Sequence, residues 1–332
     1  MRLLAPLILA ATLCAGISAQ ASETNPAQAT TRPAPPPSAA IDVPLREAIG
    51  ARAARRAPAP SAARRGGGRI GAPGSGGKHS SLFPETRVVT VYGAPQLAAT
   101  IVGKKSARGA ASEAQRLATR FGEVDPRATQ PGIDLIATIA TADRGPDGLF
   151  RSRQSPQLIG TYLDAVRGIG GRLVLDVQPG RAKFVREVKA LEQWLLEPDV
   201  DIALDPEWNV GRRGVPGITE GKVTARQLNK VSAYLAGLVR ERGLPQKGLY
   251  VHQFRDGSIR RRDEIAQRRT SVAVTLNFDG IGSPGPKAAG YRNLSRPRLF
   301  NGFSVFVSRD SDVLGFSRIA GLDPAPDYVM YQ

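Results

Sequence analysis

From Arg87 onward, short apolar segments alternate with longer segments of helical spacing, and this alternation constrains the fold most strongly. Such a pattern predicts parallel strands joined by helical crossovers. Eight predicted strands within residues 85–332 match the usual size of a (β/α)8 barrel of the TIM type. An open doubly wound sheet is the alternative. However, the first strand is followed by Tyr92-Gly93-Ala94-Pro95, which is no glycine-rich phosphate turn.

The predicted strands are 88–92, 133–138, 172–177, 202–205, 248–253, 271–278, 303–307 and 327–331. The predicted helices are 110–122, 155–168, 182–196, 224–242 and 258–268. Thr224 is a candidate N-cap for the fourth helix, and Gly243 is its expected end. Residues 280–297 are rich in glycine and proline, and we expect a loop that folds over the barrel mouth as a lid.

The first 21 residues have the pattern of a signal peptide. Arg2 gives a charged start, residues 3–13 are apolar, and Ala19-Gln20-Ala21 is a small-x-small cleavage site. The apolar run is too short to span a bilayer. Cleavage after Ala21 removes Cys14, the only cysteine, which excludes disulfides and cysteine metal sites. We therefore predict a protein that is secreted or associated with the cell envelope, with no transmembrane span in the mature chain.

Residues 22–84 are rich in Pro, Ala, Gly and Arg, a composition that predicts a disordered basic linker. The whole chain has a formal net charge of +17. In an exported protein, a basic surface favours anionic wall polymers or lipid headgroups as partners over nucleic acid. No aromatic-interleaved basic motif or zinc-finger spacing indicates nucleic-acid recognition. The predicted domains are thus the signal peptide (1–21), the linker (22–84) and the barrel (85–332).

The fourth predicted strand runs directly into two carboxylates, Asp205 and Glu207, and then Trp208. If the strand continued, alternation would place both carboxylates on one face, roughly 7 Å apart. Burial and mutual repulsion would raise the pKa of at least one of them, so that a protonated acid stands beside an ionised neighbour. The structural alternative is a helix N-cap or a surface acidic pair.

Other predicted strands also end in polar residues, and the active sites of TIM barrels lie at the C-terminal strand ends. Most of these residues have a structural alternative: Asp176 could bond a nearby amide, Asp279 could belong to a turn, and His252 or Trp208 could be packing residues. Lys287 and Tyr291 are weaker candidates from the 280–297 loop. Beside the acidic pair, the candidates are Tyr92, Asp176, Gln178, Trp208, His252, Gln253, Asn277, Asp279, Lys287, Tyr291 and Gln332.

Paired carboxylates with aromatic residues in an exported barrel indicate glycosidic-bond hydrolysis. Glu207 is the predicted general acid, because it lies farther along the strand. Asp205, Asp176 or Asp279 would be the second carboxylate, and the sequence leaves this choice open. The expected partner is a cell-wall or extracellular polysaccharide, bound by the remaining candidates with Trp208 as a stacking platform. Neither a cofactor nor a metal is predicted for this reaction.

The ending Asp205-Pro206-Glu207-Trp208 resembles the Asp-x-Glu-aromatic ending of strand four in family 18 chitinases. In that family the Glu is the acid and the Asp orients the substrate's acetamido group. Its earlier acids on the strand are replaced here by Val200 and Ala203, so the resemblance does not carry substrate-assisted catalysis. Residues 86–332 also resemble uncharacterised secreted TIM-barrel proteins of high-GC bacteria, through Asp-Pro-Glu-Trp, His252-Gln253-Phe254 and Tyr331-Gln332. This likeness implies a glycoside-hydrolase-like barrel and brings no established activity.

Two other functions remain open. A divalent-metal-dependent hydrolase of the phosphodiesterase kind would use an oxygen-rich ligand set that suits Mg²⁺ or Ca²⁺. Its ligands would come from Asp176, Asp205, Glu207, His252 and Asp279. A non-catalytic module would instead bind cell-wall glycan through its aromatic residues, while the basic linker contacts anionic polymer.

Overall fold

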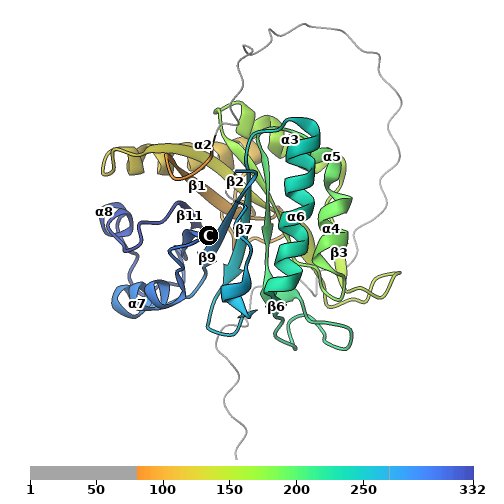
Figure 1. The fold of residues 1–332 in the computed structure, drawn as a ribbon. Coiled ribbons are helices and arrows are strands. Elements are labelled where there is room, and N and C mark those ends of the chain that lie inside the picture. Colours follow the sequence, from red (N-terminus) through yellow and green to blue (C-terminus); the bar gives the residue numbers. More distant parts are fainter. Residues whose placement is uncertain (1–80, 269) are drawn as a thin grey trace, which may run out of the picture. The chain divides into compact units, whose positions relative to one another are not determined.

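Eight parallel strands close into a barrel in the computed structural model, which describes residues 81–268 and 270–332 (Figure 1). Neighbouring strands pair in chain order, and β1 pairs with both β2 and β11, which closes the ring. The predicted (β/α)8 barrel is therefore confirmed, whereas the predicted signal peptide and most of the linker lie outside the described residues. The barrel strands are β1 (Thr86–Gly93), β2 (Ala128–Ala140), β4 (Arg172–Val177), β5 (Val200–Leu204), β7 (Lys247–Gln253), β9 (Val272–Phe278), β10 (Phe300–Val305) and β11 (Tyr328–Tyr331).

The helices pack on the outside of the barrel against the outward-facing apolar residues of the strands. For example, α6 lies against β7 and β9 and beside α4 (Figure 1). The capping prediction for α6 is confirmed: Thr224 and Gln227 form a reciprocal capping box, and Gly243 ends the helix at φ 62°. The helices are α2 (Ala107–Gly122), α3 (Pro156–Arg167), α4 (Phe184–Ala190), α5 (Glu192–Leu195), α6 (Ala225–Arg242), α7 (Pro284–Leu294) and α8 (Phe316–Ala320).

Short elements decorate the loops of the barrel. Strand β3 (Arg151–Arg153) pairs antiparallel with β2. Strands β6 (Val223–Thr224) and β8 (Ile259–Arg260) form a separate parallel pair. Two 3-10 turns, η1 (Pro206–Trp208) and η2 (Arg262–Glu264), follow β5 and β8. Among the described residues, no helix is long and apolar enough to cross a membrane.

The predicted helix at 258–268 is wrong, because this connection forms β8 and η2 instead. Arg261 adopts a left-handed φ of 57°, which breaks a right-handed helix. The backbone of the segment is held by Asn229 of α6, whose side chain accepts from the Ala266 N–H at 2.7 Å and donates to the Glu264 carbonyl at 2.9 Å. Tertiary hydrogen bonds therefore replace those of a helix.

The expected lid loop at 280–297 is also wrong, since most of it forms α7. Pro284 stands in the first turn, where its missing N–H costs no hydrogen bond. The ring of Tyr291 is fully buried and packs against Phe278 and Phe303 in the outer core. Helix α7 is thus a covering helix of the barrel wall.

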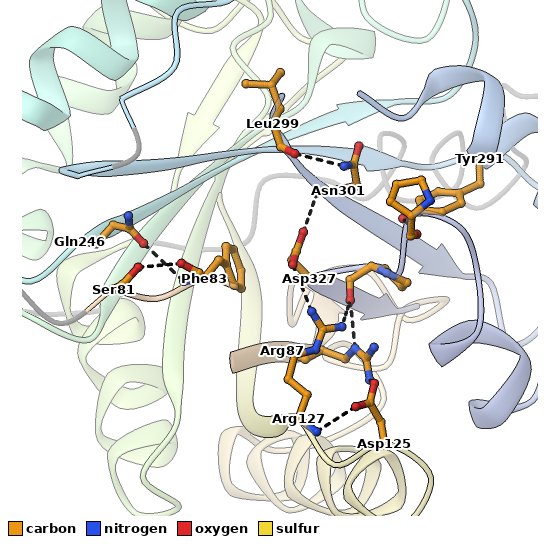
Figure 2. A network of polar contacts seen from close by, with 12 residues as sticks. Ser81, Phe83, Arg87, Asp125, Arg127, Gln246, Tyr291, Leu299, Asn301 and Asp327 are labelled. Carbon is orange, nitrogen blue, oxygen red and sulfur yellow. Dashed lines mark hydrogen bonds and ion pairs between the residues drawn. The ribbon is translucent and has the colours of Figure 1, made fainter. Parts of the chain in front are cut away.

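At the N-terminal end of the barrel, Leu82 and Phe83 pack inside the ring. The Phe83 ring centroid lies 5.1 Å from that of Phe300 and 6.5 Å from that of Tyr250. The Leu82 N–H donates to Gln246 Oε1 at 2.8 Å. The Phe83 N–H donates to the same oxygen at 3.4 Å (Figure 2). Packing against the barrel therefore begins before the predicted domain boundary at residue 85.

A polar network holds the seam where the first and last strands meet (Figure 2). The buried guanidinium of Arg87 lies 2.7 Å from Asp125, and Arg127 lies 3.1 Å from Asp327. Both arginines also donate to the Pro326 carbonyl, at 3.0 and 2.6 Å. The network joins β1 to the segments that lead into β2 and β11, so its charges lie at the closure of the ring.

We expect Phe83→Ala to lower the free energy of unfolding by about 3 to 5 kcal/mol, because it leaves a cavity in the barrel interior. Urea unfolding at neutral pH measures the change. Val124→Ala is the control, since Val124 is 39% exposed and should cost at most about 0.5 kcal/mol. Equal stability of the two variants would show that Phe83 lies outside the cooperative core.

Candidate functional site

Four barrel strands bring polar side chains together inside the C-terminal end of the ring. The Tyr92 hydroxyl of β1 donates to Asp176 Oδ2 of β4 at 3.4 Å. His252 Nδ1 on β7 lies 3.2 Å from Asn277 Nδ2 on β9. The Tyr92 and His252 rings connect the two pairs, with centroids 6.1 Å apart. All four residues are buried. The convergence follows from strand alternation, which points these residues inward.

Asp205 and Glu207 are not alternate residues of one strand, and that part of the prediction is wrong. Strand β5 ends at Leu204, and the chain then turns into η1. Asp205 caps this turn: its Oδ1 accepts from the Glu207 N–H at 3.2 Å. The cap that the sequence offered as an alternative is thus present. Asp205 is nevertheless 6% exposed, and the charges of Asp176, Glu207 and Asp279 act on it.

The loop after η1 packs closely against Glu207. The Gly221 N–H donates to the Glu207 carbonyl at 2.7 Å. A Cβ at Gly221 would lie 2.4 to 2.5 Å from backbone atoms of Pro206, Glu207 and Asn209. Only glycine therefore permits this contact, which holds the backbone of Glu207 in place. The side chains of Glu207 and Trp208 are half-buried.

Burial raises the pKa of several carboxyl groups in this region. The pKa of Asp205 lies well above its usual range because of burial, and then because of the charges of Asp176, Glu207 and Asp279. Burial also raises the pKa of Asp176 to about 6, although the nearby His252 charge opposes the shift. One layer deeper, burial and the charge of Asp176 raise the pKa of Asp134. At neutral pH, a pKa of about 6 leaves Asp176 largely ionised.

Several buried polar atoms at this end of the barrel have no hydrogen-bond partner among the described residues. They are Asp176 Oδ1, His252 Nε2 and Asn277 Oδ1. An unsatisfied buried polar group costs about 1 to 3 kcal/mol, so native proteins rarely leave several together. Their position at the strand ends is where barrels bind ligands. These atoms are therefore available to hydrogen-bond a ligand.

Three further predicted residues also lie in this cluster. Gln178 donates to the Tyr92 hydroxyl at 3.3 Å and accepts from the Ala140 N–H at 3.2 Å. The last residue, Gln332, donates to Asp279 Oδ1 at 3.1 Å. Asp279 Oδ2 lies 3.6 Å from His252 Nδ1. The carboxylate of Asp279 thus connects the end of β9 with β7 and the end of β11.

The structure does not bring Gln253, Lys287 or Tyr291 to this cluster. Gln253 follows the inward-facing His252 and so points outward, where it donates to the Leu294 carbonyl at 3.1 Å. Lys287 is buried in an ion pair with Asp310. The Tyr291 hydroxyl donates to the Pro324 carbonyl at 2.7 Å.

Sequence reasoning missed two residues that lie inside the ring beside the predicted ones. Ser304 on β10 accepts from Asn277 Nδ2 at 2.8 Å. Asp134 accepts from the Tyr328 hydroxyl at 2.6 Å in the middle of the barrel. The signal for Asp134 was available, because it is a charged residue within the buried part of β2, but its apolar neighbours conceal it.

Within the described part of the chain, no group of three or more His, Cys, Asp or Glu side chains is arranged to hold a metal ion. Comparison with known proteins gives no matching family model and no matching curated protein. The assignment of function therefore depends on the geometry of the site.

The raised pKa of Asp176 predicts a stability that falls with pH. Between pH ~4 and ~6 the folded state binds more protons at Asp176 than the unfolded state does, so the free energy of unfolding decreases as pH rises. The loss is on the order of 3 kcal/mol for two pKa units. Asp176→Asn removes this loss of stability. The variant should be more stable than the parent at pH 7 and about equally stable at pH 4, as measured by urea unfolding.

Asp199→Asn is the opposite control. Burial alone would raise the pKa of Asp199, but its hydrogen bonds and ion pair with Arg167 lower it below the usual range. Its carboxylate therefore stabilises the fold above the pKa of the unfolded state, and this variant should lose stability at pH 7. The interpretation of Asp176 would be wrong if both variants lost stability there to a similar extent.

Proposed function

We propose that the C-terminal end of the barrel is the active site of a glycoside-hydrolase-like enzyme that uses carboxylate acid/base catalysis. The proposal depends on one observation: Asp176 and Asp205, buried on the neighbouring strand ends of β4 and β5, have raised pKa values. Neither forms an ion pair with an arginine or lysine of the described chain. Carboxyl groups with pKa values set apart by their surroundings are typical of acid/base pairs.

Glu207 is the proposed general acid, because it is the more accessible carboxyl group beside Asp205. It would protonate the leaving oxygen of the glycosidic bond, which breaks as the proton is transferred. The raised pKa of Asp205 favours its neutral form. In that form it adds no negative charge beside the carboxylate that Glu207 becomes once it has given up its proton.

Asp176 is the proposed second carboxylate. Its Oδ1 is a buried acceptor without a hydrogen-bond partner among the described residues. Asp176 would take a proton from the water that attacks the anomeric carbon. Alternatively, it would attack that carbon itself to form a glycosyl ester, which water then hydrolyses while Glu207 takes the proton of the water; the sugar product receives the hydroxyl in both cases. The Tyr92 hydroxyl, which donates to Oδ2, orients the carboxylate.

The neighbouring polar groups suit a sugar ring. His252 Nε2 and Asn277 Oδ1 have no hydrogen-bond partner among the described residues and could bond hydroxyl groups of the sugar. Gln178 and Gln332 hold Tyr92 and Asp279 in position. Trp208, half-buried in η1, is the proposed stacking platform at the edge of the site.

The proposed substrate is a cell-wall or extracellular polysaccharide. This part of the proposal comes from the predicted signal peptide and the net charge of +17. A basic protein exported from the cell meets anionic wall polymers, which would hold it near the glycan.

We expect Glu207→Gln to lower kcat by about 100-fold or more, the usual contribution of a general acid. Peptidoglycan, chitin oligosaccharides and β-glucans are the test substrates, with reducing-end release and mass spectrometry of the products as the measurement. Glu220→Gln is a matched control in the same loop, where Glu220 forms an ion pair with Arg255, and it should keep full activity.

Full activity of the Glu207→Gln variant on a substrate that the parent cleaves would refute its role as the acid. If the parent binds these glycans in sedimentation assays and releases no product, the barrel is a glycan-binding module instead.

A further inference from the structure

The exposed large apolar side chains of the described chain gather at one end of the barrel. Four of the five, Ile218, Ile281, Val307 and Val313, lie in loops that follow the C-terminal ends of β5, β9 and β10. Ile218 is the most exposed, at 79%. The fifth, Val124, lies between α2 and β2, at the opposite end. The loops around the candidate site are therefore apolar at their tips.

The loops after β9 and β10 hold their apolar tips on a fixed backbone. Asp310 joins them: its Oδ1 accepts from the Gly282 N–H at 3.1 Å, and its Oδ2 accepts from the Phe306 N–H at 3.0 Å. The same carboxylate is paired with the buried Lys287 of α7. Ile281 directly precedes Gly282, and Val307 directly follows Phe306. Because the backbone is already fixed, binding through these side chains costs little ordering entropy.

Basic residues accompany the apolar tips. Arg212 and Arg213 are exposed in the loop that carries Ile218, and neither forms an ion pair with any described residue. Arg309 is exposed between Val307 and Val313. Asp312 is an exposed acid of the loop that carries Arg309, and the three arginines outnumber this one acid. Apolar side chains next to arginines are typical of surfaces that insert into the interface of an anionic bilayer.

We propose that this apolar and basic rim, made of Ile218, Ile281, Val307 and Val313 with Arg212 and Arg213, binds the surface of a membrane with anionic headgroups. A polar wall polymer would satisfy the arginines but offers no apolar phase for an isoleucine that is 79% exposed. A bilayer interface offers both.

Binding of this kind would turn the strand ends toward the headgroups. In combination with the proposed function, on which this step alone rests, the substrate would be a saccharide carried by a membrane lipid or lying at the membrane surface. Membrane binding itself requires no catalysis, so the two proposals are tested separately.

The test uses residues 22–332, without the predicted signal peptide, and sedimentation with large vesicles. The parent should bind vesicles containing phosphatidylglycerol and bind pure phosphatidylcholine vesicles much more weakly. In Ile218→Ser combined with Val307→Ser, binding to the anionic vesicles should fall by about tenfold or more, since each large side chain contributes through its buried apolar area. Arg212→Gln with Arg213→Gln should weaken binding and reduce its dependence on salt.

Val124→Ser is the matched control, because it removes an exposed valine from the opposite end of the barrel; its binding should stay within about twofold of the parent. Thermal unfolding of each variant checks that the fold is kept. Equal binding by the rim variants and the control would refute the proposal, since the basic segment before residue 81 would then account for the interaction. Absence of parent binding to anionic vesicles would refute it as well. Capture of a protein partner by the rim without vesicle binding would count against a membrane.

Discussion

Closure of the barrel at β1 is the constraint on which the rest of the structure depends. This strand pairs with both β2 and β11, segments that lie at opposite ends of the described chain. Such long-range pairing loses much chain entropy before it gains contacts. At the seam, Arg87 and Arg127 share the Pro326 carbonyl and face Asp125 and Asp327 (Figure 2). Because the ring closes there, every strand end is fixed in a single circle, and side chains from distant segments meet at its C-terminal end.

Inside the barrel, the buried carboxyl groups at the two ends have different partners. At the N-terminal end, Arg172 forms a bidentate pair with Asp201 at 2.6 and 2.8 Å, so its charge is compensated. At the C-terminal end, Asp176 and Asp205 are buried without such a partner among the described residues, and their pKa values are raised. Pairing breaks even or stabilises, whereas an uncompensated buried carboxyl destabilises the fold. The division matches the usual one in TIM barrels, with stability at the bottom and chemistry at the top.

Much of the fold was predictable, because the signals that specify it are local and periodic. Strand β4 was predicted with its observed bounds, Arg172–Val177, since it contains the short apolar run Leu173-Val174-Leu175. The residues 258–268 were not predictable, because a left-handed residue and side-chain bonds from α6 decide their conformation. In the site, strand ends pointed to Asp176 and His252 correctly. Gln253 was predicted as a site residue because it stands next to His252 at the polar end of β7. Strand alternation excludes it from the site, because His252 faces inward and Gln253 therefore faces outward. Asp134 was missed because its partners, including Tyr328, are distant in the chain.

The carboxyl groups of the site have raised pKa values although the chain has a net charge of +17, because electrostatic interactions act over short distances. The Debye length is about 8 Å at physiological ionic strength, so exposed arginines elsewhere are screened from the barrel interior. The pKa of Asp205 is governed first by burial and then by neighbouring carboxylates, not by the total charge. Within the cluster, a positive charge on His252 would oppose the rise in the pKa of Asp176. Substitution of His252 would therefore change the pKa of Asp176 more than the removal of several surface arginines would.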